Sequence, residues 1–506
     1  MKTILDYFIK RPLLLSALIC ILISVFAFYL HILVAFLSFA IAVAIGLMIY
    51  FKTDARIIFT SVLIFMFCLS FSLTLENIAS LKRQSGTTLR AECILSEITY
   101  KTDEYYTAVI RVNKSDRLHK GTKITAFYAP QQMNIGDSFV ADIKLNEIKE
   151  GSYKAHSYSN SVYLGGSLSN ITPTENDDML LKAVGNLRQY IKTTLMEHLE
   201  YNQAATVCAL LFGERDYFNS EFSDNIRNAG VSHVMVVSGM HLAIIVSFIT
   251  KIMERIFYNR YAKAILIVGV VLLLCLLCGF TMSILRAGVT YLIIAVGLML
   301  DRKGKAENSL GGAVTLILIF SPFAWFNLSL QLSVLSTFAI LVVALPLVNE
   351  IKSKFRMGFV SEYAVTSVIF SLSALIFTLP VTIYNFGCIS TVSVISNLLI
   401  SSAVTWVLYF AFTCLVLNPL LPFVTDWIFM PLSLLAEYIN FVINYMGSLS
   451  FASVEISKYW SVAAVIFILL VLLILTACKK RQNMLKLNSM NEKIVREGGG
   501  KLKWRR

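Results

Sequence analysis

The chain has 506 residues, of which 57% are hydrophobic and 15% are charged, and its formal net charge is +13. One water-soluble core cannot bury so large an apolar share, so the composition excludes an ordinary soluble protein and indicates a multi-pass membrane protein. Of the nine cysteines, only Cys93 lies away from apolar segments, so we expect neither a disulfide framework nor a metal knuckle.

Apolar windows recur along the chain, each close to the roughly 20 residues that an α-helix needs to cross a bilayer. They predict a polytopic α-helical membrane protein with about twelve transmembrane helices. Residues 321–327 interrupt one apolar stretch, either as a tight hairpin or as a broken helix that lies inside the protein or beside water. The predicted spans are 12–29, 32–50, 57–76, 232–250, 262–280, 283–300, 309–322, 328–348, 362–383, 391–416, 423–446 and 459–477.

Short basic loops set the orientation of these spans. Lys and Arg residues precede the first span, lie between the second and the third, and recur in alternate loops downstream. Because such residues collect on the cytoplasmic side, we expect both ends of the chain in the cytoplasm and the segment after the third span outside it. The first span is followed at once by a second and lacks a small-residue cleavage pattern, so we do not expect a cleaved signal peptide.

Residues 479–506 form a basic tail with ten Lys and Arg and two Glu. We expect this tail to lie against anionic lipid on the cytoplasmic side, and a docking site for a partner protein is the alternative. Most of the net charge therefore reflects membrane topology and not a nucleic-acid surface.

Residues 80–176 form a polar insert that follows the membrane helices of residues 1–79. Alternating runs separated by Gly-containing turns predict a small external β-rich barrel or sandwich. The insert is nearly neutral, with twelve Lys and Arg against ten Asp and Glu. Its basic residues cluster beside aromatic ones, which predicts a groove for a single strand, and a solvated basic face is the alternative. The cluster consists of Arg111, Lys114, Arg117, Lys120, Lys123, Tyr105, Tyr106, Phe127 and Tyr128.

Residues 177–231 are predicted to form amphipathic helices at the membrane surface, because apolar residues recur every four positions from 187 to 199. Gly213 then follows an apolar run, which indicates either a helix C-cap with a charged turn or the charged mouth of a pathway. The charged residues after it are Glu214, Arg215 and Asp216.

The segment 232–478 is predicted to hold the remaining membrane helices, and it begins with a polar motif. Polar groups are costly inside a bilayer and therefore usually have a function. On one helix, His233 and His241 would lie roughly 80° apart and Ser238 about 60° from His241, so the three would border one cavity. Gly239 would let another backbone approach closely.

Arg286 lies within a second apolar helix, where an unpaired Arg costs at least ~2.5 kcal/mol. We therefore expect it to face a hydrated path, and an ion pair with Glu214 or Asp216 is the alternative. Three further polar residues would line the same path or form hydrogen bonds between helices. They are Gln331, Ser333 and Asn397.

The order and spacing of these motifs resemble the competence domain of the ComEC family, the DNA-uptake channel of naturally transformable bacteria. The most specific stretches are 211–216 (LFGERD) and 228–241 (NAGVSHVMVVSGMH). The N-terminal spans and the insert resemble the family's N-terminal region, where an OB-like module is thought to meet incoming DNA, so the resemblance covers about residues 1–477. Further matching stretches are 283–287, 326–333, 378–380 and 387–390, with Asn397.

The resemblance implies a channel that passes single-stranded DNA across the bacterial cytoplasmic membrane during natural transformation. As partners it implies the DNA-receptor, nuclease and cytoplasmic motor proteins of the uptake machinery, and it is compatible with a homo-oligomer. The polar residues of the membrane segment would then line the DNA path, and the basic and aromatic residues of the insert would bind the incoming strand.

The chain also departs from the family pattern. Met282 stands where the family usually has proline, and residues 393–397 (SVISN) stand where it usually has Ser-Pro-Leu-Ala-Asn. The metal-binding His run of the metallo-β-lactamase-like domain that many members carry does not occur here, nor does a Gly-rich phosphate loop. We therefore expect no enzyme activity, no cofactor and no metal, and an external source of energy.

Two other functional classes stay open. In a membrane-embedded hydrolase, Ser238 with His241 or His233 would act as nucleophile and base, or the two His would bind a metal with Glu214 or Asp216; no orienting acid or oxyanion donor is evident. A small-solute transporter would usually show repeated halves, and we find no convincing internal repeat.

Overall fold

The computed structural model describes residues 11–29, 55–101, 106–128, 135–148, 151–174, 179–214, 217–253, 255, 259–301, 304–419 and 421–468. Four predicted features lie outside these residues, wholly or in part. They are the span 32–50, the end of the span 459–477, the basic tail 479–506, and the site residues Tyr105, Arg215 and Asp216.

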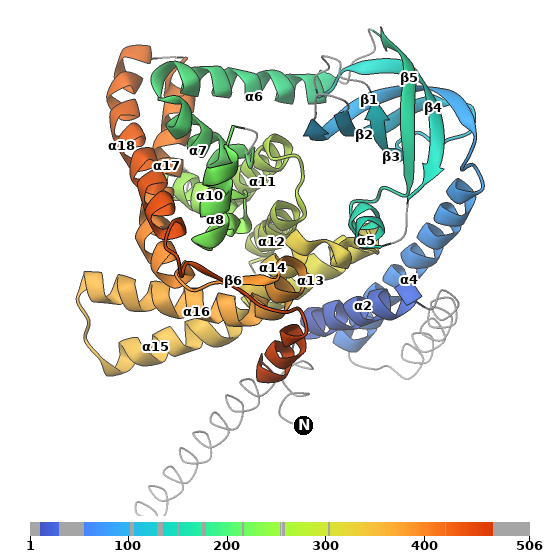
Figure 1. Ribbon diagram of the computed structural model, residues 1–506. Coiled ribbons are helices and arrows are strands. Elements are labelled where there is room, and N and C mark those ends of the chain that lie inside the picture. Colours follow the sequence, from blue (N-terminus) through green and yellow to red (C-terminus); the bar gives the residue numbers. More distant parts are fainter. Residues whose placement is uncertain are drawn as a thin grey trace, which may run out of the picture.

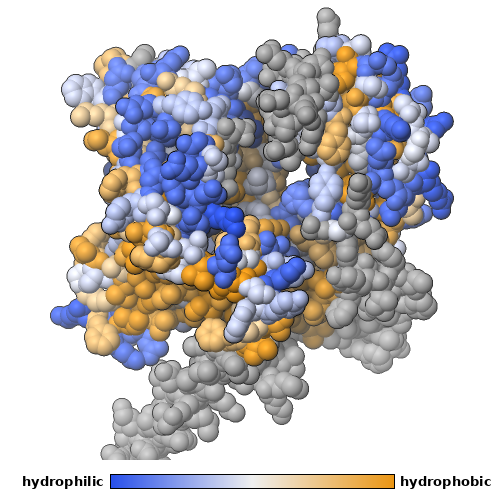
Figure 2. Space-filling view, in the orientation of Figure 1, coloured by the Kyte–Doolittle hydropathy of each residue, from blue (hydrophilic) through white to orange (hydrophobic). Residues whose placement is uncertain are grey.

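The described chain is mostly helical, with a small barrel at one side (Figure 1). Among the described residues, six helices are long and apolar enough to cross a membrane, where the sequence predicts about twelve. The mostly helical fold with membrane-length apolar helices is therefore confirmed, and the number of twelve is not. In space-filling view, apolar surface gathers in the lower part of the molecule, around α14 and α16 (Figure 2). The six are the apolar parts of α4 (Ala55–Lys82), α12 (Met282–Met299), the run α14–η2–α15 (Leu328–Ala339, Ile340–Ala344, Leu345–Lys354), α16 (Phe359–Phe386), α17 (Ser393–Leu417) and α18 (Pro422–Gly447).

Four further apolar helices are shorter. They are formed by α2 (Pro12–Tyr29), α10 (Gly239–Met253), α11 (Arg260–Leu277) and α13 (Ala306–Phe320).

The insert is a closed five-stranded barrel in the order β1-β2-β3-β5-β4, with β3 and β5 parallel and the other pairs antiparallel. The OB fold is also a five-stranded barrel, although a partly open one. Alternation along the strands fills the core, since Ala108, Ile110 and Val112 of β2 are fully buried while Arg111 between them is exposed. The strands are β1 (Thr88–Lys101), β2 (Tyr106–Ser115), β3 (Lys123–Tyr128), β4 (Ser138–Glu147) and β5 (Leu164–Thr174).

The turn 321–327 attaches the barrel to the membrane helices. It is a hairpin between α13 and α14 that contains the short η1 (Ala324–Phe326), and Asn327 caps α14 by accepting from the backbone of Ser329 and Leu330. This turn packs against α5 (Ser152–Ser159), which lies between β4 and β5. Asn327 donates to Asn160 at 3.0 Å. The barrel is thus fixed to the helices by hydrogen bonds as well as by apolar contact.

Small residues let the N-terminal helices pack closely on α13. A Cβ on Gly311 would lie 2.4 Å from the Leu14 backbone of α2, so only glycine allows this crossing. The hydroxyls of Ser16 and Thr315 form a hydrogen bond of 2.9 Å beside it.

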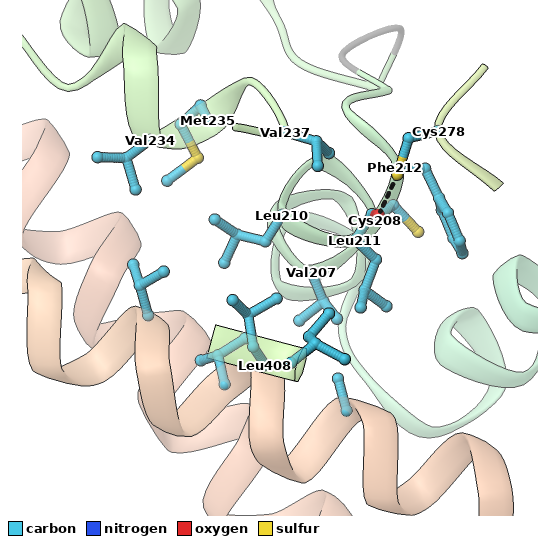
Figure 3. Close-up of a cluster of buried hydrophobic side chains, with 14 of the residues drawn as sticks. Val207, Cys208, Leu210, Leu211, Phe212, Val234, Met235, Val237, Cys278 and Leu408 are labelled. Atoms are coloured by element: carbon cyan, nitrogen blue, oxygen red, sulfur yellow. Dashed lines mark hydrogen bonds between the residues drawn. The ribbon is translucent and has the colours of Figure 1, made fainter. Parts of the chain in front are cut away.

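Helix α6 (Met179–His198) runs from the barrel toward α17 and α18 (Figure 1). It buries Ile191 and Leu195 and exposes Met179 and Leu180, as expected for an amphipathic helix. By contrast, α7 (Tyr201–Phe212) is buried from Gln203 to its end and forms the centre of the largest apolar core (Figure 3). It is therefore a core helix and not a surface helix. Gly213 ends it with φ +79, as the sequence predicts for a C-cap.

A short two-stranded sheet closes the described fold. β6 (Cys388–Ser390) and β7 (Ser453–Glu455) pair antiparallel next to α8 (Ser220–Asn228). The hydroxyl of Ser453 donates to Asn228 at 3.0 Å, so the first residue of the 228–241 motif is held by this sheet.

Candidate functional site

Five helices pack in a closed circuit, which we call the five-helix ring. α10 packs against α12, α12 against α14, α14 against α16, α16 against α17, and α17 again against α10. Segments from far apart in the sequence therefore surround one axis. The predicted path residues are Ser238 just before α10, Gly239 and His241 on α10, Arg286 on α12, Gln331 and Ser333 on α14, and Asn397 on α17, with His233 outside the ring on α9 (Ser232–Met235).

Arg286 lies on α12 and contacts both helices that pack against α12 in the five-helix ring. Its Nε and Nη2 atoms donate to the hydroxyl of Ser333 on α14 at 3.1 and 2.8 Å. Ser283, one turn earlier on α12, donates to the same hydroxyl at 2.9 Å. On the other side, the guanidinium lies against Gly239 at the start of α10, where an added Cβ would be 2.5 Å from Nη2. The side chain is only 7% exposed.

No carboxylate neutralises Arg286 within the part of the chain that the structure describes. The alternative pairing with Glu214 is ruled out, because Glu214 binds Lys192 of α6 at 2.5 Å. A buried cation that is compensated only by one hydroxyl is costly, and the nearby N-terminus of α10 adds to the positive potential. The cluster Arg286–Ser283–Ser333 is therefore electrostatically suited to a negatively charged group.

The polar motif is not a single helix, as the sequence analysis assumed. α9 ends at Met235, Val236 is extended, and α10 starts at Gly239. The break is stabilised by a capping box with histidine in the position usually held by Glu or Gln. The Ser238 hydroxyl accepts from the backbone of Met240 at 3.2 Å, and His241 Nδ1 accepts from the Ser238 backbone at 2.9 Å.

This capping geometry also bears on the hydrolase alternative. Ser238 Oγ lies 3.3 Å from His241 Nδ1, but that nitrogen already accepts from the Ser238 backbone. The proton of the neutral ring is then on Nε2, because Nδ1 serves as an acceptor. Nε2 is buried, has no hydrogen-bond partner among the described residues, and belongs to a side chain that borders a small cavity between α7, α10, α11 and the start of α12. The pair is therefore accounted for as a helix cap.

His233 lies on the other side of the break, in the short α9, and is exposed. The turn that precedes α9 packs closely against the start of α17. Gly230 has φ +72, and a Cβ there would lie 2.5 Å from Cβ of Ser393 and 2.7 Å from Ser390. Glycine is needed both for the backbone conformation and for this contact.

Gln331 and Asn397 have less specific surroundings. Gln331 donates to the carbonyl of Trp325 at 2.9 Å and so holds the turn before α14. Asn397 is half-buried on α17, and its carbonyl accepts from the Ser401 hydroxyl one turn later. Both residues lie on ring helices and the bond of Gln331 is structural, so their role in lining a path stays a prediction.

The outward face of strands β2 and β3 carries part of the predicted strand-binding cluster. Arg111 and Lys123 are paired across these strands, and Phe127 lies farther along β3 with 42% of its surface exposed. Tyr106 and Tyr128 instead point inward, with ring centroids 5.7 Å apart and Tyr128 only 3% exposed. Alternation along β3 explains the difference, because neighbouring residues face opposite sides. Phe127 is thus an exposed residue of the outer face, and Tyr128 is a core residue.

The remaining basic residues of the cluster lie at the far end of this hairpin. Lys114, Arg117 and Lys120 are exposed around the β2–β3 turn, and the carbonyl of Arg117 accepts from Gln84 at the end of α4 at 3.1 Å. They are therefore separated along the strands from Phe127.

Two charged residues that the sequence analysis did not single out complete the barrel face. Arg188 of α6 donates through Nε to the carbonyl of Leu277 at the end of α11, at 2.6 Å. Glu97 of β1 is influenced electrostatically by Arg188 and Lys123. Arg188 was visible in the sequence as a polar residue of an amphipathic helix, but no local pattern indicated which elements it joins.

Comparison with known proteins identifies the family of the chain. The sequence model of the family described as "Competence protein" matches residues 210–482, more than half of the chain. "ComE operon protein 3" of Bacillus subtilis is 24% identical over 330 residues, 65% of this chain and 41% of that protein. A Mycoplasma pneumoniae protein named "Uncharacterized protein MG316 homolog" is 31% identical over 193 residues, 38% of this chain and 46% of that protein.

The chain thus spans less than half the length of the curated relatives it matches. No solved structure matches it.

Proposed function

Because the chain belongs to the competence protein (ComEC) family, we propose that it is a channel that passes single-stranded DNA across the cytoplasmic membrane during natural transformation. The observation that carries this proposal is the buried Arg286 within the five-helix ring, whose side-chain hydrogen bonds go to the single hydroxyl of Ser333 and which no described carboxylate neutralises. Burial of such a guanidinium in a membrane protein costs free energy, unless a bound anion compensates its charge.

The chemistry of the ring suits a moving polyanion. A strand needs donors for its phosphates along a hydrated route, but too many fixed cations would hold it in place. One guanidinium supported by Ser283 and Ser333 supplies a single strong contact, and polar residues of α14 and α17 would supply weaker ones. The Arg286 side chain reaches from α12 to both α14 and α10. We therefore infer that it forms the narrowest point of the proposed DNA path.

The barrel is proposed to meet the strand first. Arg111 and Lys123 would contact phosphates, and Phe127 would stack on a base. In this account the barrel lies outside the cell, both chain ends lie in the cytoplasm, and about twelve helices cross the membrane. DNA-receptor, nuclease and motor proteins of the uptake machinery would supply the strand and the energy, and the basic tail would lie against anionic lipid.

Deletion of the gene tests the proposal. Uptake of labelled DNA into a nuclease-protected cytoplasmic pool should be lost, while binding of DNA at the cell surface persists, and the wild-type gene should restore uptake. If the host takes up DNA and the deletion strain does so normally, the proposal is wrong.

A further inference from the structure

The barrel face that carries Arg111 and Lys123 also contains an acidic residue that faces the same way. Glu97 of β1 pairs with Val109 of β2, and Val109 pairs with Thr125 of β3. Arg111 and Lys123 form the next outward-facing row along the same strands. Alternation with the buried Ile110 and Ile124 places the paired residues of β2 and β3 outside the barrel core. A β-bulge between Leu95, which is buried, and Glu97 brings Glu97 to the same outer side, opposite Val109. Glu97 is thus diagonal to a pair of cations.

This face is turned toward the membrane helices. In Figure 1, β1, β2 and β3 lie on the side of the barrel nearer to α11, while β4 and β5 lie on the far side. Figure 2 shows open space between the barrel and those helices. A strand that leaves the barrel face toward the five-helix ring would cross this space.

Arg188 of α6 adds a third cation where the helices approach this face. Its bond to the Leu277 carbonyl places it at the C-terminal end of α11, where the helix dipole stabilises a positive charge. Gly279, with φ +71, lies next to it, since a Cβ there would be in ordinary contact with Nη2 at 3.5 Å. The turn that follows leads into α12, on which Arg286 lies one turn from the start.

The charges of this region act together on Glu97. Burial raises the pKa of Glu97, whereas the positive groups of Lys123, Arg188 and His156 lower it. Burial and the neighbouring Arg111 lower the pKa of Lys123, and Glu97 raises it. Like charges opposite each other, such as Arg111 and Lys123, destabilise a sheet, and one carboxylate offsets only part of this repulsion. The region remains net positive.

We propose that Glu97 is an internal competitor of the DNA phosphates: it partly neutralises Arg111, Lys123 and Arg188 when no strand is bound, and it speeds release of a bound strand toward the ring. This inference rests on the proposed function, because it assumes a strand that must be both held and passed on. A patch with three uncompensated cations would bind more tightly but release more slowly, since each phosphate contact adds affinity that dissociation must overcome.

The test uses the full-length protein in nanodiscs and a fluorescent single-stranded oligonucleotide. Glu97→Gln removes the charge and keeps the shape, and Glu147→Gln at the exposed end of β4 is a matched control with the same change in net charge. We expect Glu97→Gln to lower Kd and the dissociation rate roughly two- to fivefold, the size of an exposed charge-pair effect. Glu147→Gln should leave both quantities unchanged.

The outcomes separate the two proposals. If the wild type binds the oligonucleotide and Glu97→Gln leaves Kd and the dissociation rate unchanged, or if Glu147→Gln has the same effect, the role of Glu97 is refuted while the channel proposal stands. If neither the wild type nor any variant binds the oligonucleotide, strand binding by the barrel fails and the role of Glu97 fails with it.

Discussion

The Arg286 guanidinium holds the Ser333 hydroxyl through two of its nitrogens, at 3.1 and 2.8 Å, and so connects α12 to α14 inside the five-helix ring. Hydrogen bonds from charged donors contribute more than neutral ones, about 1.5–3 kcal/mol each. The contact is therefore strong enough to keep the ring closed, yet a phosphate offers the guanidinium a better partner than one hydroxyl does.

Replacement of Arg286 should lower DNA uptake without lowering the amount of folded protein in the membrane. Arg286→Ala is expected to lower DNA uptake by about tenfold or more, because the loss of one charged hydrogen bond corresponds to that factor. Arg286→Lys should not restore uptake, since an ammonium group does not reproduce the planar fork of donors. Uptake is compared at equal membrane levels of each protein. Uptake within twofold of wild type in Arg286→Ala would place this residue among purely structural contacts.

Gly239 should not tolerate a side chain. In Gly239→Ala, the new Cβ would lie 2.5 Å from Arg286 Nη2 and 2.9 Å from the Ala287 Cβ, so α10 and α12 must move apart. Overpacking of this kind costs about 1–3 kcal/mol. Gly269→Ala on α11 is the matched control, because no atom of the described residues lies within 4 Å of its added Cβ. Thermal unfolding in detergent should show a lower Tm for Gly239→Ala and an equal or higher Tm for Gly269→Ala; equal Tm values for the two variants would contradict this packing.

The role of His241 as a cap predicts which substitutions it accepts. His241→Gln keeps an acceptor for the Ser238 backbone and should retain DNA uptake, whereas His241→Leu should lose about 0.5–2 kcal/mol of stability. A catalytic base would behave differently, because glutamine cannot take up a proton. Labelling of Ser238 by a serine-directed probe, together with loss of function in a stably folded His241→Gln, would favour the hydrolase alternative.

Strand binding by the barrel should weaken at high pH because of Lys123. Burial and the neighbouring Arg111 lower its pKa, so its positive charge is lost at a lower pH than that of an ordinary lysine. Affinity for a single strand should therefore fall as the pH rises through this lowered pKa. Lys123→Arg keeps the charge across the range and should remove that part of the pH dependence. Identical pH profiles for the two proteins, measured by fluorescence anisotropy, would exclude Lys123 from the contact.

The two neighbouring aromatic residues of β3 should behave in opposite ways. Phe127→Ala should weaken single-strand binding by about 1–3 kcal/mol, the usual contribution of a stacked base, with little change in stability. Tyr128→Ala should instead destabilise the barrel, by about 3–5 kcal/mol, because it removes a buried ring. Binding and thermal unfolding are measured for both. Equal losses of binding in two stably folded variants would show that the inward-facing ring is accessible after all.

Sequence patterns predicted the parts of this fold that depend on local periodicity. Apolar windows located α12, α16 and α17, and alternation located the strands of the barrel. Patterns of this kind do not reveal where a backbone breaks, so the capping box that ends at His241 was mistaken for the middle of a helix. They also do not reveal which face of a strand is outward, and Tyr128 was therefore grouped with Phe127.

The candidate site was predictable as a set of residues but not as an arrangement. The cost of a buried cation identified Arg286 without any structural information. Its contact with Ser333, 47 positions away, and the pairing of Glu214 with Lys192 depend on tertiary packing. The position of Arg188 between the end of α11 and the barrel face also depends on tertiary packing.

The most direct test of the central claim is to detect the strand inside the five-helix ring while it is being taken up. A photo-crosslinking residue is placed at position 337, one turn from Ser333 on the same face of α14, and as a control at position 434 on the exposed face of α18. Both variants must sustain uptake. The account predicts light-dependent crosslinks to incoming DNA at position 337 and none at position 434. Continued uptake without crosslinks at position 337, or with equal crosslinks at both positions, would contradict it.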